Sequence, residues 1–368
     1  MSVREILPEL IDECNLPALG VVYDSGNGSE PFVAADGVRK IGIDINATTG
    51  DIWHFGSCTK AMTAAVVALL IQDDLLSWNS TLGTILGDVD GCREMLDVYR
   101  DVTIELLSSH TSGITDAALT RDVALELHTL NAAQGRIVAT NVTLTSEPAG
   151  GAQKGVAKYA NMNYVILGLM IEIVTSISAE GVVEQRLWGP LNMTSAGWGP
   201  NPETSTSSVD NPYPHTPSGT KGTHGEAIPL PESIPVESRD NPPALNTAGR
   251  AHMRLADFNN WLRLQVDSSA QAAIGLQSSS LPKLRAVTPG SGGFTYGGWI
   301  GSLQKDGRSI LNIDGSNTLN YATAWINVGT GQTVAATTNV GGEPVQGATY
   351  LVGTHRLAEG LLDGSIVA

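Results

Sequence analysis

The chain has 368 residues, 42% of them hydrophobic, with 21 basic and 37 acidic side chains. This length suggests two domains at about 150 residues each. The net charge of −16 argues against nucleic acid and anionic membranes as partners, because both attract clustered Lys and Arg. No apolar run approaches the roughly 20 residues of a membrane-spanning helix, and the first fourteen residues contain acids and a proline where a signal peptide is apolar. We therefore expect a cytoplasmic protein without membrane or nucleic-acid partners.

The first 75 residues predict two helices and two strands. After an amphipathic helix, Ala18–Asp24 and Pro31–Ile43 favour strands, and the turn residues 25–28 separate them. A further helix is predicted to begin at Ser57, because an almost unbroken apolar stretch follows Lys60.

Residues 76–198 are predicted to be mostly helical. The clearest helical patterns are Thr103–Ser109, Asp122–Asn131 and Asn163–Ser176. Residues 199–243 then hold ten of the eighteen prolines among Ser, Thr and Gly, which is too polar and interrupted for a core element. We expect this stretch to be a structureless loop, and we favour a lid over the functional site.

The last third predicts a helix, four strands and a closing helix. Their ranges are Ala251–Gln265, Phe294–Leu303, Ser309–Ile313, Tyr321–Val328, Thr333–Asn339 and Val345–Leu362. Strands at both chain ends with helices between them imply one sheet assembled from distant segments. We predict an α/β protein of the α+β kind, with a sheet-containing domain (1–75 and 244–368), a helical domain (76–198) and the loop 199–243.

Ser57 and Lys60 are spaced so that a lysine can activate an alcohol. On a helix, positions i and i+3 share one face, which brings the amine within hydrogen-bond reach of the hydroxyl. Burial lowers the pKa of a lysine and favours the neutral amine, which can accept the proton. The alternative is a serine that only caps the helix. Cys58, two residues from Lys60, points to another face and is expected to be a small buried residue.

Three other Ser-x-x-Lys sequences occur, Ser218/Lys221, Ser280/Lys283 and Ser302/Lys305. Gly219 and nearby prolines favour a loop for the first pair, and Pro282 argues against a helix for the second. The third precedes Asp306-Gly307, a hairpin-turn signal. Only Ser57 opens a long apolar helix, so we predict Ser57 as the nucleophile.

Tyr159-Ala160-Asn161 directly precedes a predicted helix. In an extended segment, residues i and i+2 project to the same side, so the phenol and the amide can both face Ser57. A phenolate is favoured beside a lysine ammonium, which predicts Tyr159 as general base or proton relay. Asn161 would hold Lys60 or a substrate amide. The alternative is a tyrosine that only packs at the helix start.

Together these features resemble the serine beta-lactamase and penicillin-binding-protein superfamily, specifically its class C beta-lactamase-like branch, which includes family VIII-type carboxylesterases, D-stereospecific peptidases and acyltransferases. Further matching segments are Leu106-Leu107, His110-Thr111-Ser112-Gly113, Tyr164–Gly168, Gly189–Met193, Gly297-Gly298-Trp299 and Gly315-Ser316-Asn317. The resemblance implies a beta-lactamase/transpeptidase-like fold, an antiparallel sheet flanked by helices, with the site between this part and a helical domain. It also implies a structural role for the His110 stretch.

The family's third element is a strand with Lys or His, one residue and Gly, and here the matching cation is replaced by Ile313. The resemblance implies Asp314, Gly315 and Asn317 as further substrate-binding positions. It also implies an oxyanion hole from the backbone amides of Ser57 and Ser316. Without the cation, and with the negative Asp314, recognition of penicillins or peptide C-termini is not expected.

The leading hypothesis is a serine acyl hydrolase, an esterase or amidase that forms an acyl-Ser57 intermediate on a small molecule. An acyltransferase with the same intermediate is the alternative, and its partner would be a small-molecule acyl donor. A beta-lactamase, a D-peptidase and a non-catalytic binding protein are further alternatives. The three cysteines show no ligand spacing and no phosphate-cradling glycine loop occurs, so no metal or organic cofactor is expected.

Overall fold

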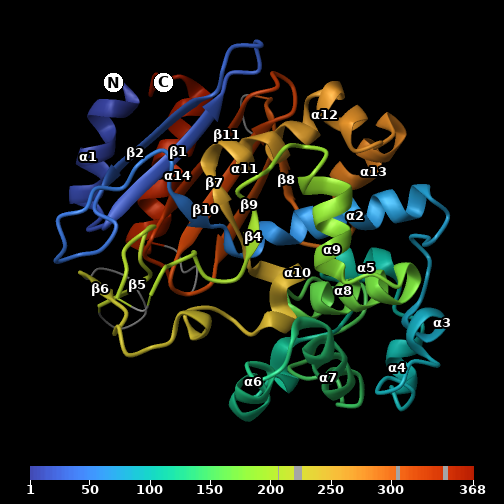
Figure 1. Cartoon of the computed structure of the whole chain (residues 1–368). Coiled ribbons are helices and arrows are strands. Elements are labelled where there is room, and N and C mark those ends of the chain that lie inside the picture. Colours follow the sequence, from blue (N-terminus) through green and yellow to red (C-terminus); the bar gives the residue numbers. More distant parts are fainter. Residues whose placement is uncertain (206, 219–225, 304–306, 343–346) are drawn as a thin grey trace.

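A six-stranded antiparallel sheet joins the two ends of the chain, in the order β2-β1-β11-β10-β9-β8 (Figure 1). The strands are β1 (Ala18–Asp24), β2 (Phe32–Gly37), β8 (Ile300–Leu303), β9 (Ser309–Ser316), β10 (Tyr321–Asn327) and β11 (Thr333–Thr338). This computed structural model describes residues 1–205, 207–218, 226–303, 307–342 and 347–368. Because β1 pairs with β11, the predicted sheet of distant segments is confirmed. The proposed domain limits stay a prediction.

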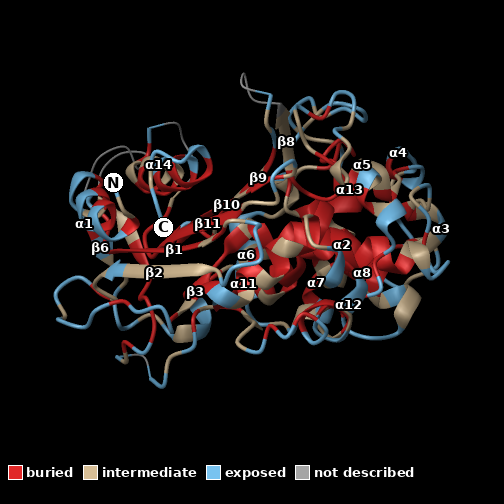
Figure 2. Ribbon diagram, turned by 90° about the horizontal axis from the view of Figure 1, so that it is seen from above, coloured by how far each residue is buried: buried red, intermediate tan, exposed pale blue. Residues whose placement is uncertain are grey.

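Each face of the sheet has its own hydrophobic core. Successive side chains of a strand point to opposite faces. Val21 therefore packs with α1 (Val3–Glu13) and α14 (Thr349–Asp363), whereas Val22 belongs to the core that contains α2 (Thr59–Gln72) and α11 (Leu255–Leu262). With both faces covered, β11 is buried along its whole length (Figure 2).

Two apolar helices, α2 and α8 (Met162–Thr175), form the centre of the helical part. Residues 59–70 of α2 and 162–171 of α8 are buried without interruption, so neither helix has a solvent face over these spans (Figure 2). Shorter helices surround them: α3 (Leu82–Leu86), α4 (Asp97–Arg100), α5 (Ile104–Ser108), α6 (Arg121–Leu127), α7 (Ala132–Leu144) and α9 (Ala179–Val183). α9 continues into a π-helical turn, Glu184–Trp188.

The segment predicted as one helix from Ala251 begins as a strand. Residues Ala251–Arg254 form β7, which lies between β3 (Ile52–His54) and β4 (Gly197–Trp198). Pairing with two neighbouring strands satisfies its backbone groups, so the helical prediction was wrong for these four residues and α11 begins only at Leu255.

Other predicted segments have different limits. The strand predicted from Phe294 begins at Ile300, after Gly298 adopts a φ of +76°. The helix predicted to reach Asn131 ends at Leu127, and Asn131 instead caps α7, which the pattern did not indicate. The strand predicted for 31–43 ends at Gly37, and the strand from Ser309 continues to Ser316. The first residues of the predicted closing helix lie outside the described residues, and α14 begins at Thr349.

The proline-rich stretch 199–243 contains short regular elements, so the prediction of a structureless loop was too simple. β5 (His215–Pro217) pairs with β6 (Ala227–Pro229), and a 3₁₀ turn covers Val236–Ser238. His215 Nδ1 contacts the Asn339 carbonyl oxygen 2.9 Å away, which holds this stretch against the end of β11. Asn241, near its end, lines the cavity described below. The lid interpretation stays a prediction.

Three further short helices are α10 (Asn246–Gly249), α12 (Ser268–Ala273) and α13 (Leu281–Arg285). Pro282 lies in the first turn of α13, where proline is tolerated because no helical N–H is lost there. The expectation that Pro282 prevents a helix was therefore wrong. Within the described residues, no single helix is long and apolar enough to cross a membrane. By length and composition alone, one pair bent by 81°, Met162–Thr175 with Ala179–Trp188, passes the same test.

Arg136 of α7 provides a stability test, because its buried guanidinium pairs with Glu172 and Glu180. We expect Arg136→Met to lower the free energy of unfolding by about 3 kcal/mol, since it leaves two largely buried carboxylates unpaired. Chemical denaturation measures this. Arg93→Met, which removes an exposed pair with Asp90, is the control and should cost less than about 1 kcal/mol. Equal losses in both variants would contradict the prediction.

Candidate active site

Two glycines allow the segment that carries Ser57 to contact strand β9 directly. Ser57 lies in the 3₁₀ turn Gly56–Cys58, directly before α2, so the helix predicted to begin at Ser57 begins at Thr59 instead. Gly56 has a φ of +49°, and a Cβ there would lie 2.5 Å from the Ser316 nitrogen. A Cβ on Gly315 would overlap the Phe55 carbonyl oxygen. Both positions therefore require glycine, and they bring Ser57 beside Ser316.

The register of β9 directs the Ser316 amide away from β10. Tyr321 is opposite Ser316, and the Val328 N–H donates to the Ser309 carbonyl at the other end of the pair. Hydrogen-bonded and non-hydrogen-bonded pairs alternate in an antiparallel ladder, so Ser316 is in a non-hydrogen-bonded pair. Because the pairing of β8 with β9 reaches only Asn312, the Ser316 N–H lies at the open sheet edge, next to the Ser57 turn.

The Lys60 amine faces three acceptors. Its Nζ lies 3.0 Å from Ser57 Oγ, 2.8 Å from Asn161 Oδ1 and 2.5 Å from the Ala248 carbonyl oxygen. An ammonium donates to all three. A neutral amine has two hydrogens and one lone pair, and amide and carbonyl oxygens only accept. Its lone pair is therefore left for the Ser57 hydroxyl, which makes this geometry suitable for removing the hydroxyl proton.

Asp116 determines which end of the Asn161 amide meets the lysine. Its carboxylate accepts from Asn161 Nδ2 at 3.1 Å and from the main-chain nitrogens of Asn161 and Met162 at 3.0 and 2.9 Å. The amide oxygen is thereby turned toward Lys60. No motif in the sequence indicated Asp116, because its partners are about 45 residues away along the chain.

Burial is the main influence on the charge of Lys60. It lowers the pKa of this lysine to about 7, although the nearby Asp116 carboxylate acts in the opposite direction. A substantial fraction of the amine is therefore neutral at physiological pH, as its predicted role requires.

The Tyr159 hydroxyl contacts Ser57 directly, with 2.7 Å between the two oxygens. Lys60 Nζ lies 4.9 Å from the centre of the Tyr159 ring. Beneath this ring lies His110, whose ring centre is 4.6 Å away. His110 Nδ1 accepts from the Ala160 N–H, and burial lowers the pKa of His110 to about 3. His110 thus supports the Tyr159 segment as a neutral side chain.

Of the other Ser-x-x-Lys pairs, only Ser280/Lys283 lies wholly within the described residues, and its two side chains have separate partners. Ser280 Oγ donates to Gln72, while Lys283 pairs with Glu105. Lys221 and Lys305 of the other two pairs, and Asp306 of the predicted hairpin turn, lie outside the described residues. Cys58 is fully buried, and burial raises the pKa of its thiol. This agrees with the prediction of a small buried residue.

The site opens into a cavity of about 500 Å³. Apolar side chains, including Phe294 and Ile313, form much of its wall, and Asp314 lies beside Ile313. Asp314 Oδ1 accepts from Thr323 Oγ1 at 2.6 Å and contacts His355 Nε2 at 3.0 Å. Among the described lining residues, Lys60 is the only Lys or Arg, and Asp314 is the only Asp or Glu. The described cavity wall therefore includes one residue that bears a carboxylate and, apart from the buried Lys60, no Lys or Arg.

Asn317 also lines the cavity, but protein contacts occupy its side chain. Asn317 Nδ2 donates to Asp240 at 3.0 Å, and its Oδ1 accepts from the main chain of Leu319 and Asn320. The expectation that Asn317 binds substrate stays a prediction, whereas its contact with Asp240 was not anticipated. Within the described residues, no three His, Cys, Asp or Glu side chains gather as a metal site.

Comparison with known proteins gives a family match over most of the chain. The Beta-lactamase family model matches residues 9–354. An unguisins hydrolase of Aspergillus campestris is 22% identical over 77% of this chain and 50% of its own length. This chain spans about half the length of the curated relatives it matches.

Solved structures give the same fold at low sequence identity. D-amino acid amidase from Ochrobactrum anthropi SV3 matches with a TM-score of 0.74 at 17% identity, covering 99% of both chains. A D-stereospecific amidohydrolase from Streptomyces sp. matches with a TM-score of 0.71 at 18% identity, covering 96% of this chain and 97% of that one. These matches confirm the predicted beta-lactamase/transpeptidase-like fold class.

The charge state of Lys60 can be measured directly. In ¹³C NMR of protein with labelled lysines, we expect one of the seven lysine side chains to titrate near pH 7 and its signal to be absent from Lys60→Ala. Asp116→Asn should move this titration to lower pH, because the Asp116 charge raises the pKa of Lys60. A Lys60 signal that titrates above about pH 9 would show that burial does not control this amine.

Proposed function

This chain belongs to the beta-lactamase family, and from that membership we propose that it is a serine acyl hydrolase acting on small-molecule esters or amides. The main support for this proposal is that the Ser57 hydroxyl contacts both the Lys60 amine and the Tyr159 hydroxyl. The Ser316 nitrogen lies close to Gly56, the residue before Ser57, so the main-chain amides of Ser57 and Ser316 are the proposed oxyanion donors. These contacts support a site in which a nucleophile, proton acceptors and oxyanion donors act together.

In the proposed reaction, Ser57 Oγ attacks the substrate carbonyl carbon while its proton passes to the neutral Lys60 amine, directly or through Tyr159. The N–H groups of Ser57 and Ser316 stabilise the negative charge that develops on the carbonyl oxygen. When the tetrahedral intermediate collapses, the bond to the leaving alcohol or amine breaks and this group receives the proton. Water then attacks acyl-Ser57, the carboxylic acid leaves, and Ser57 regains its proton.

The charges around the cavity support substrates without a carboxylate. Ile313 provides no cation near the oxyanion strand, and the adjacent Asp314 carboxylate repels an anionic substituent. Penicillins and peptide C-termini carry such a carboxylate, so beta-lactamase and D-peptidase activities are less favoured. Neutral or cationic substrates fit this cavity better.

Both amides and esters belong in the proposed substrate class. Structural neighbours named as a D-amino acid amidase and a D-stereospecific amidohydrolase suggest amide bonds, and activated esters react readily with a serine nucleophile. An acyltransferase would use the same acyl-enzyme with an alcohol or amine in place of water. Product analysis with added acceptors distinguishes transfer from hydrolysis.

Intact-protein mass spectrometry tests the covalent mechanism. With a panel of activated esters, amides and one beta-lactam, we expect the wild type to show an acyl adduct or turnover, and Ser57→Ala to show neither. Cys58→Ala is the matched control, because it removes the adjacent but buried nucleophile, and it should keep the activity. A wild type that neither reacts with nor turns over any member of the panel would support a non-catalytic binding protein instead.

Two esters that differ only in a carboxylate or a carboxamide distant from the reacting carbonyl test the charge argument. We expect kcat/KM to be at least about tenfold higher for the neutral ester, because Asp314 repels the anion. Asp314→Asn should reduce this preference, and Ile313→Lys should reduce it further by adding a cation. A wild-type preference for the anionic ester would contradict the argument.

A further inference from the structure

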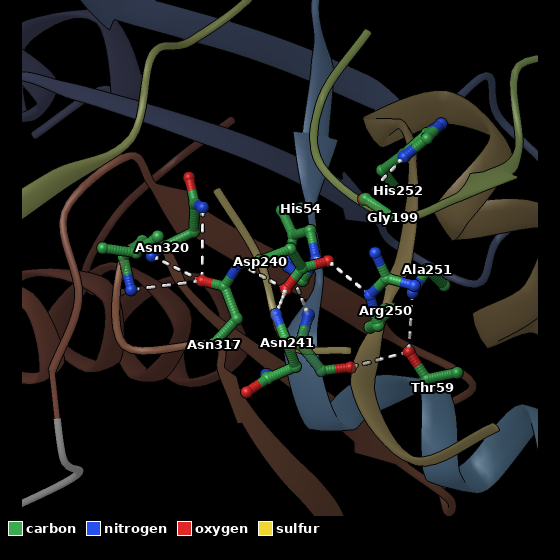
Figure 3. Close-up of polar contacts among 12 residues, drawn as sticks. His54, Thr59, Gly199, Asp240, Asn241, Arg250, Ala251, His252, Asn317 and Asn320 are labelled. Atoms are coloured by element: carbon green, nitrogen blue, oxygen red, sulfur yellow. Dashed lines mark hydrogen bonds and ion pairs between the residues drawn. The ribbon is translucent and has the colours of Figure 1, made fainter. Parts of the chain in front are cut away.

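A fully buried carboxylate, Asp240, lies at the centre of a polar cluster outside the Ser57, Lys60 and Tyr159 contacts (Figure 3). We define the Asp240 cluster as His54, Asp240, Arg250 and Asn317. The side chains of Asp240 and His54 have no exposed surface, and that of Arg250 is 6% exposed. Burying charged groups costs free energy of folding. The contacts of Asp240 lead to three segments of the candidate site.

The first contact of Asp240 leads to the Ser57 turn. Asp240 Oδ2 lies 2.9 Å from His54 Nε2, and the Gly56 N–H donates to His54 Nδ1 at 3.1 Å. Because Nδ1 accepts this bond, Nε2 carries the hydrogen and donates it to Asp240. The carboxylate thereby selects the tautomer of His54 that holds the backbone of Gly56, the residue before Ser57.

The second contact leads to the oxyanion strand. Asn317 Nδ2 donates to Asp240 Oδ1 at 3.0 Å. With its amide turned this way, Asn317 Oδ1 accepts from the main-chain N–H groups of Leu319 and Asn320 at 3.2 and 2.9 Å. Asp240 therefore also orders the turn that follows Ser316, the last residue of β9.

The third contact leads to the acceptor of Lys60. Arg250 Nε donates to Asp240 Oδ2 at 3.0 Å, and its NH1 donates to Asn246 Oδ1 at 2.6 Å. These two contacts span α10, whose Ala248 carbonyl accepts from Lys60. Although burial alone would raise the pKa of Asp240, its contacts with His54, Arg250 and Asn317 lower that pKa to about 2, so it remains a carboxylate.

We propose that Asp240 is a positioning residue, which holds the backbone amides of Ser57 and Ser316 at the separation that a developing oxyanion requires. This inference rests on the proposed hydrolase function. Oxyanion donors are effective only when they are preorganised at 2.7–3.1 Å from the oxygen in the transition state. The Asp240 carboxylate, near the end of the stretch 199–243, holds the residue before Ser57 and the residue after Ser316. It thereby limits the separation of the two amides.

The test compares Asp240→Asn with the wild type on an ester that the wild type hydrolyses. The asparagine amide has one acceptor oxygen where the carboxylate has two, so in either orientation its nitrogen faces donors. These are His54 and Arg250 in one orientation and Asn317 and the Asn241 N–H in the other, so one set of contacts is lost with little change in volume. We expect kcat to fall by about 10- to 100-fold and KM to change by less than about threefold. The affinity for a boronic acid, whose tetrahedral Ser57 adduct occupies the oxyanion site, should fall by a factor similar to that of kcat.

Asp51→Asn is the matched control. Asp51 is also a buried carboxylate, and it pairs with Arg39 through two hydrogen bonds, but it contacts neither Gly56 nor Asn317 in the described contacts. We expect this variant to keep kcat and boronic acid affinity within about twofold of the wild type, even if its melting temperature falls. If Asp240→Asn does not fold, His54→Asn removes the imidazole that joins Asp240 to Gly56 and keeps the Arg250 and Asn317 contacts of Asp240, and it should show the same selective loss of kcat.

Two results would overturn the proposal. One is an Asp240→Asn protein, or a His54→Asn protein in its place, with kcat and boronic acid affinity like those of the wild type. The other is an equal loss in Asp51→Asn, which would assign the effect to stability. Failure of the proposed hydrolase function can be distinguished from these results, because the wild type itself would then form no Ser57 adduct. In that case the proposed positioning role of Asp240 would also be wrong.

Discussion

One buried amine joins the parts of the structure on which the site depends. Lys60 extends from α2, and its Nζ contacts the Ser57 turn, the residue before α8 and the carbonyl of Ala248 in α10. Burial disfavours the charged form of Lys60. The three oxygens accept the hydrogens of an ammonium, and in a neutral amine two of them accept hydrogens while the lone pair points to the Ser57 hydroxyl. Any shift of these elements would therefore leave a buried nitrogen without an acceptor, at considerable cost in free energy.

A second constraint is the direct contact between two backbones. The Ser57 turn and the end of β9 approach so closely that Gly56 and Gly315 leave no space for a side chain. The oxyanion donors of the proposed reaction belong to these two segments, one encoded near the N-terminus and one near the C-terminus. The antiparallel pairing of β1 with β11 is what brings these ends together. The site can thus be complete only after the central strands have paired.

The charges around the cavity bear on which substrates the proposed site can accept. Ile313 and Asp314 line this cavity, and its described wall presents no exposed Lys or Arg. The nucleophile, the lysine and the tyrosine are nevertheless in mutual contact. Under the proposed function, these contacts would serve an acyl-enzyme reaction, and the charge of the cavity wall favours a substrate other than penicillins.

Local sequence determined the parts of this protein that depend on spacing and hydrophobic pattern. Ser57 and Lys60 are three residues apart, and the apolar run after them specifies a buried helix, so their contact was predictable. The strand-like runs 18–24 and 333–339 likewise predicted β1 and β11. Only the tertiary structure decided that Ala251–Arg254 is a strand, because its partners β3 and β4 come from distant segments. It also decided the contacts of Asp116 and Asp240, because partners such as Asn161 and His54 lie far from them in the sequence. A single carboxylate has no local pattern, and its effect depends on which buried donors the fold brings within hydrogen-bond distance.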